Sequence, residues 1–405
     1  MTDATVNLSR RRGLRLRPGG NLVTFGLLLP GLVFILLMFV WPIVSMLARA
    51  VYSPELERAL PATILAMADW NGEGLPPDAV AQALLGDLRG IDRARAADAG
   101  RRLNYEIPGF RTLLLKTVNK GDPAKGFEAL RAIDARWDDP SYWRAIRRAS
   151  PVLTSYYLLT ALDFERREDG GIGAAPAERA LFVPVLVRTL WISTVVTLTC
   201  LLLAFPVAYA IASAPRRRQA VLMLLVLLPF WTSLLVRSSA WVILLQDNGL
   251  LNMLMIRLGI ITEPVRMIFN RTGVYIALIH VMLPFMVLPL CNAMRAVPGD
   301  YVRAAFSLGA SAPRTLLQVY LPQVWPGIAA GSLLTFVICV GYYVTPLLVG
   351  GTSDQMLSYF VAFYTNQTVN WGLASALAVV LSGLMLVLLG LYALIPRRGG
   401  LTARA

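Results

Sequence analysis

The sequence predicts an all-α integral membrane protein with six transmembrane helices and a mostly helical external insertion between the first two. Hydrophobic residues make up 56% of its 405 residues and charged residues only 15%, whereas soluble domains contain about 25% charged residues. The apolar residues gather in stretches long enough to cross a bilayer, which takes about 20 residues. One long segment, residues 52–181, differs because it is polar and carries charges of both signs.

Six apolar stretches meet the length requirement, and several contain Pro or Gly, which membrane helices tolerate when neighbours satisfy the freed backbone groups. They lie at about 22–48, 182–212, 219–245, 273–295, 325–348 and 372–395. The predicted boundaries are a basic N-terminus at 1–21, a first transmembrane helix at 22–51, the insertion at 52–181, a transmembrane core at 182–395 and a tail at 396–405.

Basic loops predict the orientation of these helices. RRRGLRLR precedes the first stretch, PRRRQ (215–219) joins the second to the third, and PRR (396–398) follows the sixth. Lys and Arg mark cytoplasmic loops, so both termini are predicted in the cytoplasm and the insertion outside. Arg257, Arg266 and Arg271 lie in an external loop and run against this rule. The first apolar stretch is too long for a cleaved signal and is interpreted as a retained span.

The insertion reads as a soluble, mostly helical domain. In FEALRAIDARWDDPSYWRAIRRAS (127–150) apolar residues recur at helical spacing on a polar background. EDGGIGAAPAE (168–178), rich in Gly and Ala, is the predicted exit linker.

The sequence has few candidate catalytic or metal-ligating residues. Cys200, Cys291 and Cys339 all lie in predicted spans, so no disulfide framework or metal site is expected and they are interpreted as packing residues. The single histidine, His280, is either a hydrogen-bonded structural residue or, as the alternative, a proton relay or ligand. No catalytic residue emerges, and the chain is not expected to be an enzyme.

No GxxxxGK[ST] phosphate-binding pattern exists, so the chain is not expected to hydrolyse ATP itself. The net charge of +14 is attributed to cytoplasmic loops that face anionic lipid headgroups. The sequence has no basic stripe interleaved with aromatic residues, so a nucleic-acid partner is not expected. Any energy for transport would therefore come from another subunit.

Residues 298–322 lie between the fourth and fifth spans and are unusual for their polarity. The sequence YVRAAFSL predicts a short helix that ends at Gly309, where a helix C-terminus favours glycine. APRTLLQVYLP predicts a second short helix that ends at Pro322. Two short helices at an angle would protrude from the cytoplasmic face, and an amphipathic helix lying on the headgroups is the alternative.

This segment resembles the EAA loop of ABC importer permeases. The matching positions are Ala304, Ala305, Gly309, Ala310, Leu321, Pro322, Pro326 and Gly327, whereas Arg303 stands at the family's glutamate position. The resemblance implies a coupling helix that docks in a groove of an ATPase subunit. ATP and Mg would be bound by that partner, with no cofactor in this chain. Arg303 would pair with an acidic residue of the ATPase or lie at the periphery of the contact.

Three further stretches are similar to spermidine/putrescine-type importer permeases: LLPFWTSLLVRSSAWVILLQDNGLLN (227–252), IHVMLPFMVLPLCNAM (279–294) and GYYVTPLLVGG (341–351). The resemblance implies a type I importer fold in a bacterial inner membrane. It also implies three partners: a second permease subunit, a dimeric ATPase and an external substrate-binding protein. The partner permease could be a homologue or a second copy.

The candidate substrate pathway rests on aromatic and polar residues of the same stretches. They are Trp231, Ser233, Arg237, Trp241, Tyr342, Tyr343 and Thr345. Aromatic faces attract cations by about 0.5–1 kcal/mol when exposed and about 2 kcal/mol when desolvated, which suits a polyamine; an aromatic belt at the membrane interface is the alternative. Arg237 would repel a cation if it faced the pathway. One alternative is that it binds a carbonyl or phosphate at the outer interface. The other is that it indicates an anionic or zwitterionic cargo.

The expected function is that of a permease subunit which forms half of a translocation pathway for a polyamine-like solute. Other cargoes left open are an opine or amino-acid-like solute, a phosphonate and an anion such as sulfate. A membrane receptor that uses the insertion as a ligand domain is the alternative class.

Overall fold

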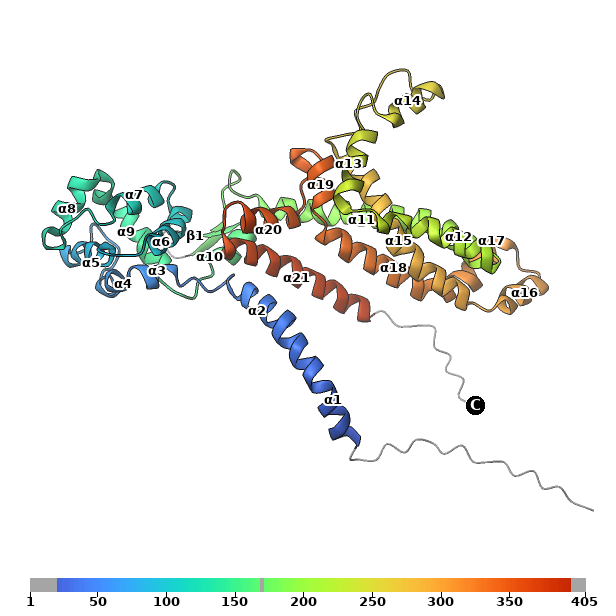
Figure 1. The fold of residues 1–405 in the computed structure, drawn as a ribbon, viewed down its shortest axis with the longest axis horizontal. Helices are drawn as coiled ribbons and strands as arrows, with labels where there is room; N and C mark the ends of the chain where they lie inside the picture. The colour runs from blue at the N-terminus through green and yellow to red at the C-terminus, as the bar shows by residue number, and fades with distance from the viewer. Residues whose placement is uncertain (1–19, 168–170, 395–405) are drawn as a thin grey trace, which may run out of the picture. The chain divides into compact units, whose positions relative to one another are not determined.

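The computed structural model describes residues 20–167 and 171–394. It divides into two compact units, Met1–Ala48 and Arg49–Ala405 (Figure 1). The predicted tail 396–405 and nearly all of the basic N-terminus 1–21 lie outside the described residues.

The first unit is one continuous apolar helix. It consists of α1 (Gly20–Ile35), a π turn at Leu36–Val40 and α2 (Trp41–Ala48). In the π turn the Trp41 N–H bonds to the Leu36 carbonyl, one residue further back than in an α-helix, just before Pro42 removes a donor. Phe25–Ala48 is long and apolar enough to cross a membrane.

Five helices of the described residues are long and apolar enough to cross a membrane, or six if one sharply bent pair forms a single span. The five are Phe25–Ala48, α11 (Phe182–Ser213), α15 (Arg271–Ala296), the continuous helix Ala312–Gly341 that ends in α18 (Leu321–Gly341), and α21 (Trp371–Leu394). Shorter elements of the core are α14 (Leu250–Arg257), α16 (Gly299–Ser307), α17 (Ala312–Thr315), α19 (Val344–Val349), a 3-10 turn (Thr352–Asp354) and α20 (Leu357–Asn366).

The third predicted span, 219–245, is not one straight helix. It is a pair bent by 96° between Arg216–Trp231, which comprises α12 (Arg216–Leu227) and a 3-10 turn, and α13 (Leu234–Leu244). Pro229 has no N–H for the helical ladder, and Thr232 and Ser233 adopt extended backbone conformations. Hydropathy alone did not reveal this break, because the residues on both sides of it are apolar.

Helices α11, α15 and α18 pack into the centre of the core. Their shared interior includes Cys200, Cys291 and Cys339, all buried and free, as expected of packing residues. Gly327 brings α18 close to α15, because a Cβ at this position would lie 2.3 Å from the Ala293 Cβ. Small residues at such contacts let membrane helices approach closely.

The insertion is a helical domain with its own core, in which Trp137, Trp143 and Phe110 are fully buried. The Trp143 Nε1–H donates to the Trp137 carbonyl at 2.9 Å, and the Trp137 Nε1–H donates to the Thr117 hydroxyl at 3.0 Å. Its α-helices are α3 (Glu55–Ala59), α4 (Pro61–Ala66), α5 (Asp78–Leu88), α6 (Arg93–Glu106), α7 (Phe110–Thr117), α8 (Gly126–Ile133), α9 (Pro140–Ala149) and α10 (Tyr156–Ala161), with 3-10 turns at Pro123–Lys125 and Ala135–Asp138.

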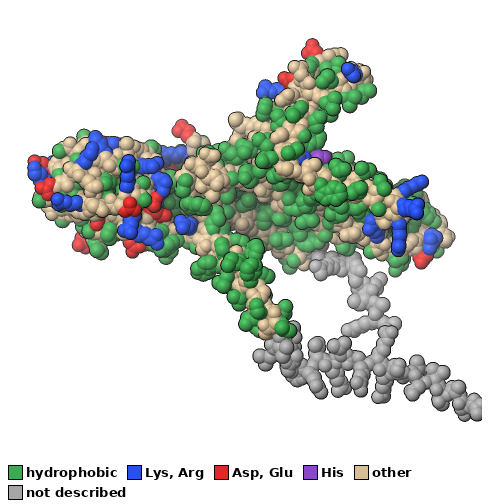
Figure 2. Space-filling model, in the orientation of Figure 1, with side chains coloured by type: hydrophobic (Ala, Val, Ile, Leu, Met, Phe, Trp, Pro, Cys, Tyr) green, Lys and Arg blue, Asp and Glu red, His purple; other side chains and the backbone are tan. Residues whose placement is uncertain are grey.

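The chain enters and leaves this helical domain side by side. The Ser53 N–H bonds to the Val152 carbonyl at 2.8 Å, and the Thr154 N–H bonds to the Val51 carbonyl at 2.8 Å. Residues 54–151 are therefore closed off by a pair of backbone hydrogen bonds. On the face shown in Figure 2, charged side chains of both signs gather over this domain, whereas hydrophobic side chains cover the helices of the core.

The predicted linker at 168–178 is partly ordered as a strand, which corrects the expectation of a simple connection. Strand β2 (Ile172–Ala174) pairs antiparallel with β1 (Phe164–Arg166); residues 168–170 lie outside the described part. Ahead of β1, the buried Asp163 carboxylate accepts hydrogen bonds from the N–H groups of Leu181, Phe182 and Val183. The insertion thereby caps the N-terminus of α11, where a carboxylate is favoured by the orphan N–H groups and the helix dipole.

Candidate functional site

The candidate coupling loop, residues 298–322, is broken at Gly309 as expected. Gly309 adopts a φ of +80°, in the left-handed region that glycine occupies at no steric cost. The Ala310 N–H reaches back to the Ala305 carbonyl and the Gly309 N–H to the Phe306 carbonyl, both at 3.0 Å. These bonds satisfy the last carbonyls of α16 and end it.

The second helix of the loop does not end at Pro322, contrary to the prediction. A π turn at Leu316–Tyr320 joins α17 to α18, so that one helix continues from Ala312 to Gly341. The Leu321 N–H bonds to the Leu316 carbonyl, five residues back, immediately before proline removes the next donor. The longer hydrogen-bonded ring widens the helix where the proline ring would otherwise crowd the preceding turn.

The loop presents apolar side chains to its surroundings. Leu308 at the break is 88% exposed and Leu317 is 61% exposed. Of the two alanines in the motif, Ala304 is exposed and Ala305 is buried within the chain. Arg303 forms an exposed ion pair with Asp300, one turn earlier on α16, so its charge already has a partner in this chain.

The coupling loop and the insertion lie at opposite ends of α11. The Tyr320 ring of the loop packs edge-on against Tyr209 near the C-terminal end of α11, with ring centroids 5.9 Å apart. The insertion caps the other end of α11 through Asp163. Phe182 and Tyr209 are 27 residues apart in one helix, which corresponds to about 40 Å, the thickness of a bilayer with its headgroups.

Arg237 binds the backbone at the bend of the third span. Its guanidinium donates to the Thr232 carbonyl at 3.0 Å, to the Thr232 hydroxyl at 3.2 Å and to the Pro229 carbonyl. The Thr232 carbonyl lies at the break in the helix, whereas the Pro229 carbonyl also accepts from the N–H and the hydroxyl of Thr232. Of the interpretations left open for Arg237, the structure shows carbonyl binding.

Two other pathway candidates make contacts that link α13 to its neighbours. The Trp241 Nε1–H donates to His280 Nδ1 at 3.2 Å, and the two rings pack edge-on with centroids 5.4 Å apart. Thr345 is buried, and its hydroxyl shares a hydrogen bond of 2.9 Å with Ser238. His280 is therefore hydrogen-bonded, and Ser238 is a polar partner that the sequence did not single out.

The remaining pathway candidates are spread over the surface. Trp231 is 76% exposed and Tyr343 is 37% exposed, Ser233 is exposed, and Tyr342 is half-buried with its carbonyl bound to the Ser358 hydroxyl at 2.9 Å. The structure brings Trp241 and Thr345 to the packed side of α13, whereas Trp231 and Ser233 lie open at the bend.

A charged cluster near the start of α15 was missed by the sequence reasoning. Asp354, 4% exposed, accepts from Arg271 Nε at 3.0 Å. Arg188 of α11 donates to the neighbouring Gln355 carbonyl at 3.0 and 2.6 Å. Asp354 lies in a loop between predicted spans, where acidic residues are common. Its burial, which the sequence does not show, is what distinguishes it from other loop residues. Among the described residues, no group of three or more His, Cys, Asp or Glu side chains is placed to hold a metal ion.

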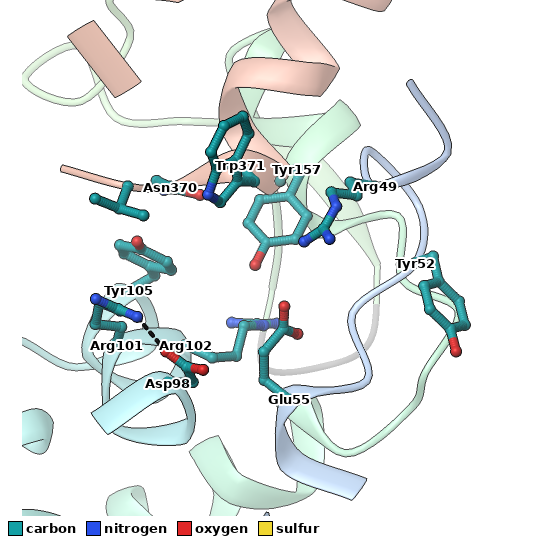
Figure 3. A pocket seen from close by; sticks show the side chains of 12 residues that line it. Arg49, Tyr52, Glu55, Asp98, Arg101, Arg102, Tyr105, Tyr157, Asn370 and Trp371 are labelled. Carbon is teal, nitrogen blue, oxygen red and sulfur yellow. Dashed lines mark hydrogen bonds and ion pairs between the residues drawn. The ribbon is translucent and has the colours of Figure 1, made fainter. Parts of the chain in front are cut away.

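A cavity of about 220 Å³ lies where the insertion meets the N-terminus of α21. We call it the junction cavity; its walls come from residues 49–55, from α6, from Tyr157 and from residues 369–372. Figure 3 shows arginine, carboxylate and aromatic side chains around one space. Burial raises the pKa of Tyr105 to about 12.

The apolar spans, with an exposed glycine-broken loop between two of them, define an integral membrane protein. The chain belongs to the family described as "Binding-protein-dependent transport system inner membrane component", whose family model matches residues 201–399. It is a permease subunit of an ABC importer of the spermidine/putrescine type, and a multi-pass protein of the inner membrane.

Two curated relatives support this assignment. The chain is 32% identical over 212 residues to the spermidine/putrescine transport system permease protein PotB of Salmonella typhimurium (strain SL1344), covering 52% of this chain and 74% of the relative. It is 31% identical over 249 residues to PotB of Haemophilus influenzae (strain ATCC 51907 / DSM 11121 / KW20 / Rd), covering 60% of this chain and 87% of the relative.

Among solved structures, the chain resembles one in a bacterial alginate ABC transporter crystallised in complex with an alginate pentasaccharide-bound periplasmic protein. The identity is 17% and the TM-score 0.44, over 52% of this chain and 76% of that one. The predicted all-α permease class is confirmed by the family. The receptor alternative is wrong, because the family consists of transport components.

Proposed function

We propose that the chain forms half of the translocation pathway of an ATP-driven importer, with a second permease subunit, and takes up a polyamine-like or related small polar solute from an external binding protein. The relatives named above are spermidine/putrescine permeases, which supports the cargo class. Both termini are then in the cytoplasm and the insertion is outside. Opine or amino-acid-like solutes, phosphonates and anions such as sulfate remain competing cargoes for the same architecture.

The observation that carries this proposal is the coupling loop. It is exposed, it carries the apolar side chains of Leu308 and Leu317, and it lies about 40 Å along α11 from the insertion. An exposed apolar surface of this kind typically marks an interaction site. A dimeric ATPase, which binds ATP and Mg, is the partner we assign to it, because the chain itself has no phosphate-binding motif.

Within the loop, Leu308 and Ala304 would enter the ATPase surface and Arg303 would lie at its rim. Arg303 is 77% exposed and paired with Asp300, and an exposed pair contributes at most about 1 kcal/mol. An acidic residue of the ATPase could therefore replace Asp300 at little cost. Ala305, Gly309, Ala310, Leu321 and Pro322 would act by shaping the loop rather than by direct contact.

The pathway itself is assigned to the surface beside the bend of the third span, where the exposed Trp231 offers an aromatic face and Ser233 a hydroxyl. Tyr343 contributes a second aromatic side chain. The Arg237 guanidinium keeps its charge but is directed to the backbone carbonyl and hydroxyl of Thr232, so we assign it a structural role at the bend. Trp241, Tyr342 and Thr345 would support this wall from behind.

The test is uptake of labelled putrescine and spermidine into vesicles that contain the permeases and the ATPase, with the binding protein outside and ATP inside. Leu308→Asp should abolish uptake and co-purification of the ATPase, because a carboxylate would be buried in an apolar contact. The matched control is Leu153→Asp, at a leucine of the insertion that is 74% exposed. Unchanged uptake by Leu308→Asp would contradict the coupling role, and uptake of ornithine or sulfate in place of the polyamines would contradict the cargo.

A further inference from the structure

The junction cavity has the composition of a ligand site, and it lies at the first residues of one apolar span, α21. We propose that it binds a small zwitterionic solute that carries a carboxylate and an ammonium group, and that it is a site separate from the transport pathway. The proposal holds whatever the transported cargo is, because it rests only on side chains at the junction of the insertion with α21.

The carboxylate side of the site is indicated by Arg102. Its side chain is 2% exposed and lines the cavity, so that its guanidinium places a positive charge at the cavity wall. Its Nε–H is buried without a partner among the described residues and is not open to a ligand. The guanidinium lies 4.7 Å and 5.5 Å from the ring centroids of Tyr156 and Tyr157, which hold it in place.

The positive charge of Arg102 is only partly balanced within the chain. It shares the Glu106 carboxylate with Arg148, at 3.1 Å and 3.4 Å respectively. Arg49, on the opposite wall, forms no ion pair within 4.0 Å among the residues that the structure describes. The cavity therefore has positive charge available for an anionic group.

The ammonium side is indicated by Glu55. One of its oxygens accepts from the Ser53 hydroxyl at 2.7 Å, and within the described ranges no Lys or Arg pairs with it. The other acidic residue of the lining, Asp98, is already paired with Arg101. In Figure 3 the Tyr157 hydroxyl is directed toward the space beside Arg102 and Glu55, so opposite charges and a hydroxyl meet in one small volume.

The walls of the cavity limit the size of the ligand. Tyr157 packs directly on Gly372, where a Cβ would lie 2.4 Å from its ring, and Trp371 and Tyr105 add aromatic surface. A volume of about 220 Å³ suits a solute of amino-acid size. The lining has three arginines and two acidic residues, so it disfavours a polycation such as spermidine, which has no carboxylate for Arg102.

The experiment compares ornithine with putrescine, which is the same molecule without the carboxylate. The full chain, held in nanodiscs of phosphatidylcholine only, is titrated with each compound by calorimetry. Tryptophan fluorescence is measured in the same titrations, and a change that is absent from the Trp371→Phe variant reports occupancy of the cavity. Ornithine should bind, and putrescine should bind at least about tenfold more weakly, as expected for the loss of one charged hydrogen-bonded group.

Arg49→Gln and Glu55→Gln should each weaken ornithine binding by about tenfold, and Gly372→Ala should weaken it by displacing Tyr157. Arg95→Gln is the matched control, because Arg95 is exposed on α6 and does not line the cavity. All four variants avoid removing the buried Arg102, and their folding is checked by thermal unfolding.

Equal binding of putrescine and ornithine, or wild-type affinity in both Arg49→Gln and Glu55→Gln, would overturn the proposal. A lipid source of similar chemistry is tested by nanodiscs with phosphatidylethanolamine, whose headgroup also carries an anion and an ammonium group. If that lipid changes Trp371 fluorescence and blocks ornithine, the ligand is a headgroup and not a free solute. Failure of ornithine and phosphatidylethanolamine to bind at all would also refute the site, and would leave the transport function of the chain untouched.

Discussion

At the scale of single residues, several polar side chains of the core bind other groups of the chain. Arg237 is the clearest case, because a guanidinium in a predicted span first suggests an anionic cargo, whereas its donors are occupied by Pro229 and Thr232. A bent helix exposes carbonyls, and a forked donor placed one turn later satisfies several of them together. The residue that seemed to contradict a cationic cargo is thus explained by the bend.

The Arg237 explanation gives a stability prediction. Arg237→Ala should lower the free energy of unfolding by about 1 kcal/mol, because the Thr232 carbonyl loses its side-chain donor while the Pro229 carbonyl keeps its donors from Thr232. Arg237→Lys should recover only part of the loss, since an ammonium lacks the fork of the guanidinium. Thermal unfolding of the detergent-solubilised protein measures both. Normal stability with altered cargo selectivity would instead place Arg237 in the pathway.

A second residue-scale prediction concerns Asp134 of the insertion. Hydrogen bonds from Arg136 and Lys116 hold the pKa of the Asp134 carboxyl well below its usual range. Its stabilising contribution is therefore fully present above the unfolded pKa of about 3.9 and is lost as the pH falls through the lower folded value.

The pH dependence can be measured with Asp134→Asn, which keeps an acceptor for the Arg136 N–H and removes the charge. The variant should be less stable than wild type by about 1 kcal/mol at pH 7, because both cationic partners are partly exposed. Acid titrations followed by tryptophan fluorescence should show this difference unchanged to about pH 5 and shrinking toward pH 2. A difference that stays constant to pH 2 would show that charge plays no part.

At the scale of elements, the coupling loop owes its shape to one left-handed residue. A Cβ at Gly309 would meet no atom within 4 Å, so a substitution there acts through backbone strain alone. Gly309→Val should leave the complex assembled with basal ATP hydrolysis, but reduce hydrolysis stimulated by the loaded binding protein and uptake by at least about tenfold, because β-branched residues avoid positive φ.

Gly309→Asn is the matched variant, since asparagine tolerates the left-handed region far better than valine. It should retain most of the stimulated hydrolysis and uptake in the same vesicles. Equal losses in both variants would show that the position requires the absence of a side chain, as at a direct contact with the partner, and not a particular backbone angle.

The sequence predicted where the helices lie better than it predicted where they bend or continue. Hydropathy predicted the spans, and the preference for glycine at a helix C-terminus predicted the break at Gly309, because both depend on residues near one position. It did not predict the bend before Ser233 or the helix that continues through Pro322, since both depend on whether displaced backbone groups find new partners. Trp241 and His280 are far apart in the chain, and so are the segments that line the junction cavity. No local sequence pattern predicts that such segments meet.

At the scale of the whole molecule, the insertion can be removed at a defined place. Residues 54–151 lie between backbone segments that are hydrogen-bonded to each other, so a short Gly/Ser loop can replace them while α10, the hairpin and the Asp163 cap remain. The core should still assemble with its partners, because its helices pack on one another.

This replacement tests a docking role for the insertion, which we propose from its position beyond the end of α11 opposite the coupling loop. Loss of binding-protein docking and of the ATP hydrolysis that it stimulates is the expected result. Surface plasmon resonance and ATPase measurements on the assembled complex distinguish the alternatives: normal docking with unstimulated hydrolysis indicates a structural cap, and normal values for both contradict the docking role.

The close approach of α15 and α18 at Gly327 has a mechanical consequence. The coupling loop connects these two helices, and its second half is continuous with α18 through the π turn. A side chain added at Gly327 would meet the Ala293 Cβ at 2.3 Å, so the two helices are in direct contact there. A force applied to the loop would therefore act on both helices, which pack closely on each other within the core.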